Sequence, residues 1–244
     1  MTKEKDKDLV PFNEHNLVPD PETRKEIMKS LEGVSLVFPV IKILHQAIMF
    51  EMPDGSKAES FRGIILDTNL GNAWWETPFE ESGGGDIPDC FSRNGIHPGK
   101  DVLEPQAPTC TACEKNQFGT DGHGKACKNM RRVHVIVEGT FLPYRLSLSP
   151  ANLKPADKYL ILLASKGLGY IHVLTEFKLK EATNQDNIKY SEIVLSNLQK
   201  IETNTVIDQL KRMREEFLDS MREQVITYKE YDPNIEKKEA PDAQ

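Results

Sequence analysis

The most regular hydrophobic pattern in the chain lies between residues 201 and 231. Its apolar positions recur at spacings of three and four residues, with lysine, arginine and glutamate on the other faces: Val206, Leu210, Met213, Phe217, Met221 and Val225. This spacing predicts one amphipathic α-helix, for which Thr205 and Asp208 provide a suitable start. Its apolar face should pack against the body of the chain or against a second copy, so an oligomer through this helix is possible.

Two earlier regions carry patterns typical of β-strands. From Ser35 to Asn69, two apolar and partly β-branched runs flank the turn-forming sequence PDGS at 53–56, which predicts a β-hairpin. Apolar and polar residues then alternate from Val133 to Val137 and from Tyr170 to Leu179, as in half-buried strands. Between these two strands, a short helix is predicted from near Pro155 to Gly167. Together the patterns predict a mainly β, α+β fold.

The two ends of the chain differ from this central part. Residues 1–33 combine mixed charge and prolines with a short helical pattern that a glycine would end, and they are predicted to form a weakly packed N-terminal arm that could bind a partner. Residues 34–200 are predicted to form the β domain, with an insertion at 88–132, and residues 201–231 the C-terminal helix. Residues 232–244 are polar and are predicted to form a disordered tail.

Composition and charge narrow the possible functions. The chain has 244 residues, of which 38% are hydrophobic, enough for one large or two small cores. No segment approaches the roughly 18 consecutive apolar residues of a membrane span, and the charged N-terminus does not resemble a signal peptide, so a cytoplasmic protein without membrane contact is expected. The net charge of −7 argues against binding polyanions over the whole surface, so contact with nucleic acid would require a local basic patch.

The four cysteines of the chain all lie within 38 residues, with the spacing C-x19-C-x2-C-x13-C: Cys90, Cys110, Cys113 and Cys127. The central C-x2-C pair can direct two thiolates at one ion, and two further cysteines complete the tetrahedron that zinc prefers. In a reducing compartment, clustered cysteines more often bind metal than form disulfides. The spacing therefore predicts a structural Zn²⁺ site.

This prediction has two alternatives. Cys90 could be an isolated buried cysteine, with the other three clustered by coincidence. If only Cys90 is not a ligand, His97 or His123 could replace it. A site with four cysteine ligands is closed, which favours a scaffolding role over hydrolysis, since a catalytic zinc usually keeps a position for water.

The insertion and its flanks combine cations with aromatic rings. Four cations fall within residues 125–132, beside glycines that allow a phosphate backbone to come close. Single-stranded nucleic acid typically binds in a basic groove with aromatic rings on which bases stack. Because neighbouring residues of a strand point to opposite faces, at least one of Trp74 and Trp75 should point inward. The candidate nucleic-acid-binding residues are Trp74, Trp75, Phe91, Arg93, Lys115, Phe118, Lys125, Lys128, Arg131 and Arg132.

The segments "FRGIILDTNLGNAWWE", "CFSRNGIHP", "PQAPTCTACEKNQFGTDGHGKACKNMRRVHVI" and "LPYRLSLSPANLKPADKYL" together resemble bacteriophage and prophage proteins of replication and recombination modules. Single-stranded DNA-binding proteins with an OB-type β-barrel and a zinc-bound insertion belong to this group. The resemblance runs from about residue 38 to 177, and it implies that the four thiols bind zinc and that the loop and basic end contact DNA. The chain departs from the pattern in having a single residue between Lys125 and Cys127.

These observations predict an OB-like β-barrel that binds single-stranded DNA without sequence preference, in replication or recombination, rather than an enzyme. The chain has no G-x-S-x-G, P-loop or H-E-x-x-H motif. The first alternative is a zinc-ribbon module that grips a host or phage replication or transcription protein, which the amphipathic helix would also suit. The second is a metal-dependent nuclease, because carboxylates such as Asp67 and Glu76 could converge with others in the folded chain.

Overall fold

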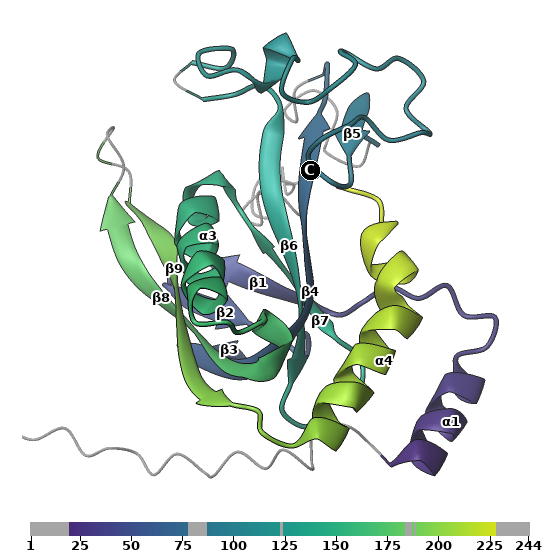
Figure 1. Ribbon diagram of the computed structural model, residues 1–244. Helices are drawn as coiled ribbons and strands as arrows, with labels where there is room; N and C mark the ends of the chain where they lie inside the picture. Colours follow the sequence, from purple (N-terminus) through teal and green to yellow (C-terminus); the bar gives the residue numbers. More distant parts are fainter. Residues whose placement is uncertain (1–19, 78–86, 123, 184–186, 188, 228–244) are drawn as a thin grey trace, which may run out of the picture.

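The computed structural model describes residues 20–77, 87–122, 124–183, 187 and 189–227. A single strongly curved sheet of nine strands forms the body of the protein (Figure 1), in the order β3-β2-β1-β7-β6-β4-β8-β9, with β5 paired to β4. The β1–β7 pair is parallel and the other pairs are antiparallel. The strands are β1 (Val40–Leu44), β2 (Met49–Glu51), β3 (Lys57–Ala58), β4 (Ser60–Trp74), β5 (Cys90–Ser92), β6 (Lys128–Val137), β7 (Tyr144–Leu148), β8 (Val173–Thr183) and β9 (Lys189–Lys200).

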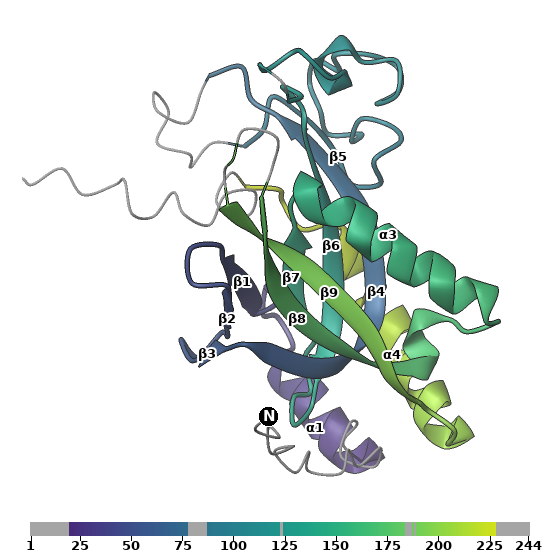
Figure 2. The ribbon, with the colours of Figure 1, turned by 90° about the vertical axis from the view of Figure 1, so that its left-hand side faces the viewer.

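Helices cover both faces of this sheet (Figure 2). They are α1 (Pro21–Ser30), α3 (Pro150–Ser165) and α4 (Asn204–Arg222), with short 3-10 turns η2 (Glu114–Asn116) and η3 (Tyr170–His172). Successive β4 residues point to opposite faces, so Ile64 packs in the cluster beneath α4 and Ile65 in the cluster beneath α3. The central strands are therefore buried on both sides, and the protein has the mainly β, α+β fold that the sequence predicts.

The predicted hairpin at 53–56 is confirmed. Gly55 has a φ of +83°, which a residue without a side chain adopts readily, and the backbone N–H of Met52 donates to the Ser56 carbonyl at 2.8 Å. The apolar run before it contains a second turn between β1 and β2, where Ile48 has a φ of 53°. The sequence does not predict this turn, because it contains neither glycine nor proline.

The start predicted for the helix near Pro155 is wrong. Helix α3 begins at Pro150, and Pro155 lies inside it. The extra N-terminal turn is held by tertiary contacts of the buried Asn152, which accepts a hydrogen bond from the Ile193 N–H at 2.7 Å and donates to the Ser191 carbonyl at 3.2 Å. Proline at the first helical position is also favourable, because its missing N–H would have no partner there.

Helix α4 carries the predicted apolar stripe, but it spans Asn204–Arg222 rather than the predicted 201–231; residues 223–227 are not helical, and 228–231 lie outside the described residues. The stripe residues from Val206 to Met221 are buried in the core against β4 and β6, whereas Val225 lies beyond the helix and is 51% exposed. The chain's own sheet therefore covers the face that the sequence offered for self-association. The short helix predicted before Gly33 is also present as α1, and Met28 packs against the same core. Among the described residues, no helix has the length and apolar character to cross a membrane.

A buried ion-pair cluster fixes α4 to the sheet. Asp67 of β4 is fully buried and accepts hydrogen bonds from Arg214 and Arg222 of α4, at 2.9–3.1 Å. The sequence offered this carboxylate as a nuclease candidate, but both of its oxygens are bound to guanidinium groups. Of the predicted ends of the chain, residues 1–19 of the arm and the tail at 232–244 lie outside the described residues.

Candidate metal centre and nucleic-acid interface

The insertion lies at one end of the sheet, where β4 and β6 extend beyond the rest of the body (Figure 1). Strand β5 pairs with the end of β4, so that Cys90 lies opposite Trp74. Cys127 immediately precedes β6, which pairs with the same part of β4. Strand pairing therefore brings the first and last cysteines together, although 36 residues separate them.

The four cysteines surround one small cavity. All four are free thiols, and each lines the same space of about 20 Å³. A cavity needs roughly 10–15 Å³ to hold one water molecule, so this one admits a single small guest. Burial, and then the neighbouring thiols, raise the pKa of Cys127 to about 12, and burial also raises the pKa of Cys90. A bound metal ion would reverse this effect, because it deprotonates the thiols that coordinate it.

The thiols share a cavity but are not yet spaced as ligands. Within the described ranges, no three His, Cys, Asp or Glu side chains are arranged so that they could hold a metal ion. Sharing a cavity requires only proximity, whereas coordination requires sulfur atoms at about 2.3 Å from one centre. Side-chain rotation can bring four neighbouring thiols that line one cavity closer together. The donor set and the space fit one Zn²⁺ ion if the thiols move inward.

Hydrogen bonds hold the backbone around each buried thiol. The N–H of Cys110 donates to the Ile96 carbonyl, and that of Cys127 to the Lys115 carbonyl, both at 2.8 Å. The side chain of Gln117 donates to the Cys113 carbonyl at 3.2 Å. These contacts position the cysteines before any ion binds.

Three asparagines tie this loop to the sheet. The Asn129 amide of β6 donates to Asn72 of β4 at 2.8 Å and to Asn116 of the loop at 3.0 Å, and Asn116 donates to the Cys110 carbonyl at 2.8 Å. The sequence analysis missed Asn72 and Asn129, because nothing in their local sequence shows that they meet. His97 is exposed and does not line the cavity, and His123 lies outside the described residues.

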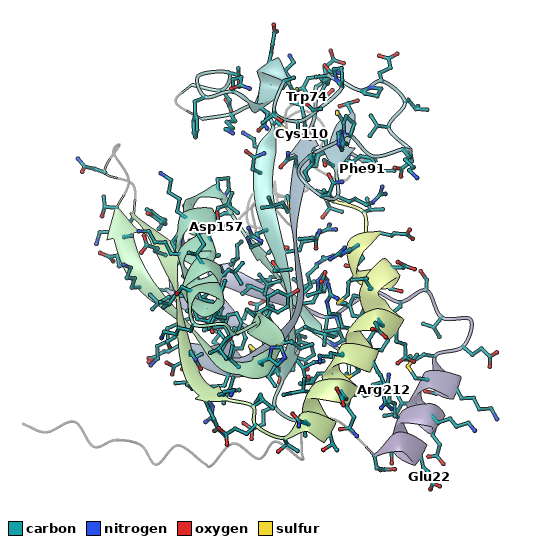
Figure 3. All side chains as sticks on the ribbon, in the orientation of Figure 1. Glu22, Trp74, Phe91, Cys110, Asp157 and Arg212 are labelled. Atoms are coloured by element: carbon teal, nitrogen blue, oxygen red, sulfur yellow. The ribbon has the colours of Figure 1, made fainter. Side chains whose placement is uncertain are left out.

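The four aromatic candidates differ in burial: Phe118 is exposed, both tryptophans are partly buried and Phe91 is buried. Phe118 is 81% exposed, and Trp74 is partly exposed. Phe91 is buried, and Trp75 packs against the same small core cluster. The sequence prediction that at least one of the two adjacent tryptophans points inward is therefore confirmed for Trp75. Phe91 and Trp75 pack at the base of the insertion, whereas Trp74 lies beside Cys110 and Phe91 at the same end of the molecule (Figure 3).

The Trp74 and Phe118 rings each lie against a lysine. The ammonium nitrogen of Lys115 lies 4.8 Å from the centre of the Trp74 ring, and that of Lys125 lies 4.9 Å from the centre of the Phe118 ring. Both distances are typical of cation–π contacts. The insertion thus presents two sites at which a cation and an aromatic face lie together.

The arginines at the basic end are engaged within the protein. Arg132 is 1% exposed and donates to the carbonyls of Gln224 and Val225 at 2.7 and 2.8 Å, so the prediction that it contacts nucleic acid is wrong. The neighbouring Arg131 points to the other side of β6 and pairs with Asp157 of α3 at 2.6 Å. A strand alternates its side chains, and here one of two adjacent cations faces the core.

Two other predicted cations also have acidic partners. Arg93 forms a bidentate pair with Asp101, with both distances at 2.8 Å, and lies over the Phe91 ring. Lys128 pairs with Asp121 at 2.5 Å. The predicted basic end is therefore largely neutralised, and Lys115 and Lys125 are the candidates whose ammonium groups lie against exposed or partly exposed rings.

No family model, curated protein or solved structure matches this chain. The resemblance to phage single-stranded DNA-binding proteins thus remains a prediction. Any functional conclusion must therefore come from the residues and contacts of the chain itself.

Proposed function

We propose that the protein binds single-stranded DNA without sequence preference through the tip of its insertion, which a Zn²⁺ ion on the four cysteines keeps folded. The two lysine–aromatic pairs are the observation that carries this proposal. Bases would stack on Trp74 and Phe118, while Lys115 and Lys125 contact the adjacent phosphates. Every base has a flat π face, so this mode of binding does not select a sequence.

The cysteines and the two pairs belong to one small structure. Lys115 follows Cys113 closely, and its carbonyl accepts the hydrogen bond from the Cys127 N–H. Phe118 and Lys125 face each other across a tight turn, in which the Gly119 N–H donates to the Gly124 carbonyl at 2.8 Å. Gly119 has a φ of +90°, a conformation that glycine adopts without strain. An ion bound by the thiols would therefore fix both stacking sites.

Cys90, Cys110, Cys113 and Cys127 would hold the ion. Zinc bound by four thiolates acts as a structural cross-link and contributes directly to the free energy of folding. This role suits the insertion, whose own apolar cluster is small: Ala73, Phe91, Val102, Met130 and Ile226. On this proposal the strongly curved sheet is an OB-like barrel that carries the insertion at one end, in a protein of phage type that acts in replication or recombination.

Phe118→Ala is expected to weaken binding to fluorescein-labelled oligo-dT by about five- to 150-fold, because stacking contributes roughly 1–3 kcal/mol per base. Phe118 is 81% exposed, so its loss should leave the melting temperature unchanged. Fluorescence anisotropy measures the dissociation constant. Ile161→Ala on α3, which removes a side chain that is 67% exposed, is the matched control.

The salt dependence of the same titration tests the lysines. Each phosphate contact on a single strand contributes about −0.7 to the slope of log K against log salt. Lys125→Gln should make the slope less negative by about this amount. If Phe118→Ala binds oligo-dT as tightly as the parent protein and the parent shows no salt dependence, the insertion is not a DNA-binding surface.

A further inference from the structure

A second, much larger cavity lies beside β5 and shares Trp74, Phe91 and Gln106 with the cavity of the thiols. It has a volume of about 600 Å³ and opens to the surface. We call it the acidic groove and define it by three apolar and three acidic residues that line it: Trp74, Ile87, Leu103, Glu76, Asp89 and Glu104. Figure 3 shows Trp74 at this end of the molecule, close to Cys110 and Phe91.

The apolar residues of the groove are unusually exposed. Leu103 is 96% exposed and Ile87 is 67% exposed, and both line the same groove as the partly exposed Trp74. Single exposed apolar side chains are common, but several that converge on one hollow are typical of a site that contacts another molecule. A partner that covers them would remove this apolar surface from water.

The charge of the groove favours a cationic ligand. Four carboxylates line it, namely those of Glu76, Asp89, Glu104 and Asp101, and a bidentate arginine neutralises Asp101. Lys115 is the one cation that lines it among the described residues, and its ammonium group already lies over the Trp74 ring. The groove therefore attracts cations more strongly than a nucleic-acid backbone.

We propose that the acidic groove docks a basic amphipathic segment of a partner protein. Lysine or arginine side chains of the segment would pair with Glu76, Asp89 and Glu104, and its leucine-like side chains would cover Ile87 and Leu103. The position of Lys115 shows that an ammonium group is accommodated against the indole ring. A second copy of this chain fits poorly as the occupant, since the chain carries a net charge of −7. The groove shares Trp74 and Lys115 with the first proposed stacking site and is separate from the second, at Phe118 and Lys125.

The test uses the full chain and three fluorescein-labelled 12-residue peptides, measured by fluorescence anisotropy. One peptide combines leucine with lysine, the second leucine with glutamate, and the third glycine with lysine. The leucine–lysine peptide should bind most tightly, since it alone satisfies both the carboxylates and the apolar side chains. The Glu76→Gln, Glu104→Gln double variant should weaken its binding about tenfold, as loss of complementary charge does at interfaces.

Two further variants distinguish binding at this groove from attraction of the peptide by the net charge of the protein. Glu59→Gln with Glu215→Gln makes the same change in net charge at exposed positions outside the groove, and should leave peptide binding unchanged. Leu103→Ser should weaken binding of the leucine–lysine peptide and leave binding of the glycine–lysine peptide unchanged. The proposal is wrong if the two double variants lose the same affinity for the leucine–lysine peptide, or if Leu103→Ser binds this peptide as tightly as the parent does. It is also wrong if the leucine–glutamate peptide binds the parent as tightly as the leucine–lysine peptide does.

Oligo-dT binding distinguishes this proposal from the DNA-binding one. The Glu76→Gln, Glu104→Gln variant should bind oligo-dT at least as tightly as the parent, because it removes negative charge near the strand. Loss of both ligands in this variant would mean that its two carboxylates support the DNA site itself, and would overturn the docking surface. Peptide binding that persists in Phe118→Ala, while oligo-dT binding is lost, would support a docking surface that does not depend on Phe118.

Discussion

Replacement of Cys113 by serine is expected to abolish stable zinc binding and to unfold the insertion, while the curved sheet stays folded. The hydroxyl of serine is a poor ligand for Zn²⁺, and three remaining thiolates leave the site incomplete. Structural zinc contributes about 10–16 kcal/mol to the folding of small zinc domains, so its loss should exceed what the small apolar cluster of the insertion can offset. The parent should contain about one zinc ion per chain, and the variant almost none after dialysis against a chelator.

Two measurements locate the effect. Hydrogen exchange should rise across residues 90–127 and stay low in β6 and β8, and oligo-dT binding should fall at least as much as in Phe118→Ala. Thr111→Ser, at an exposed position between Cys110 and Cys113, is the control and should keep its zinc. If the parent purified from zinc-supplemented cells contains no metal, and Cys113→Ser melts at the same temperature, the four cysteines are a buried cluster with no ion.

Arg132→Ala is expected to destabilise the whole fold by about 3–5 kcal/mol, because a hydrogen bond from a charged donor contributes about 1.5–3 kcal/mol and Arg132 makes two of them. Its loss leaves the carbonyls of Gln224 and Val225 without these partners. The next residue, Ile226, is buried beneath the insertion together with Phe91 and Met130. The Arg132 side chain thus holds the segment after α4 against the base of the insertion.

The neighbouring residue is the best control for this prediction. Arg131→Ala removes the same charge but breaks a partly exposed pair with Asp157 and a long hydrogen bond of 3.4 Å to Thr68, so it should cost about 1 kcal/mol. Arg212→Ala removes an exposed arginine of α4 and should be neutral. Urea unfolding gives the free energies, and the melting temperature of Arg132→Ala should fall by about 10 °C. Equal losses for Arg131→Ala and Arg132→Ala would contradict the structural role of Arg132.

The local pattern of apolar and polar residues was sufficient to predict several of the strands, turns and helices. The period of two predicts strands at Val133–Val137 and Tyr170–Leu179, and both are present except that Tyr170–His172 form a 3-10 turn. The spacing of three and four predicts α4. Both periodicities follow from backbone geometry alone. The PDGS turn depends on four consecutive residues. The start of α3 was not predictable in this way, because its first turn is held by contacts between Asn152 and the distant strand β9.

In the candidate site too, some features can be recognised in the sequence and others depend on tertiary contacts. The C-x2-C spacing, the aromatic residues and the lysines of the insertion can be recognised in the sequence, and the sequence also shows that one of two adjacent tryptophans must face inward. It could not show which cations remain at the surface. Arg131 and Arg132 are equivalent in sequence, and only the position of residues 224 and 225, more than 90 residues further along the chain, makes one of them internal.

The sequence by itself determined the periodic strands and helices, that α4 has one apolar face, and that four thiols lie in a single insertion. Tertiary structure alone decided which partner each charged group meets. Asp67 pairs with Arg214 and Arg222, which lie 147 and 155 residues further along the chain. The acidic groove likewise gathers Glu76, Asp89 and Glu104 from separate segments. Backbone periodicity is a local property, whereas the neutralisation of a buried charge depends on which distant surface covers it.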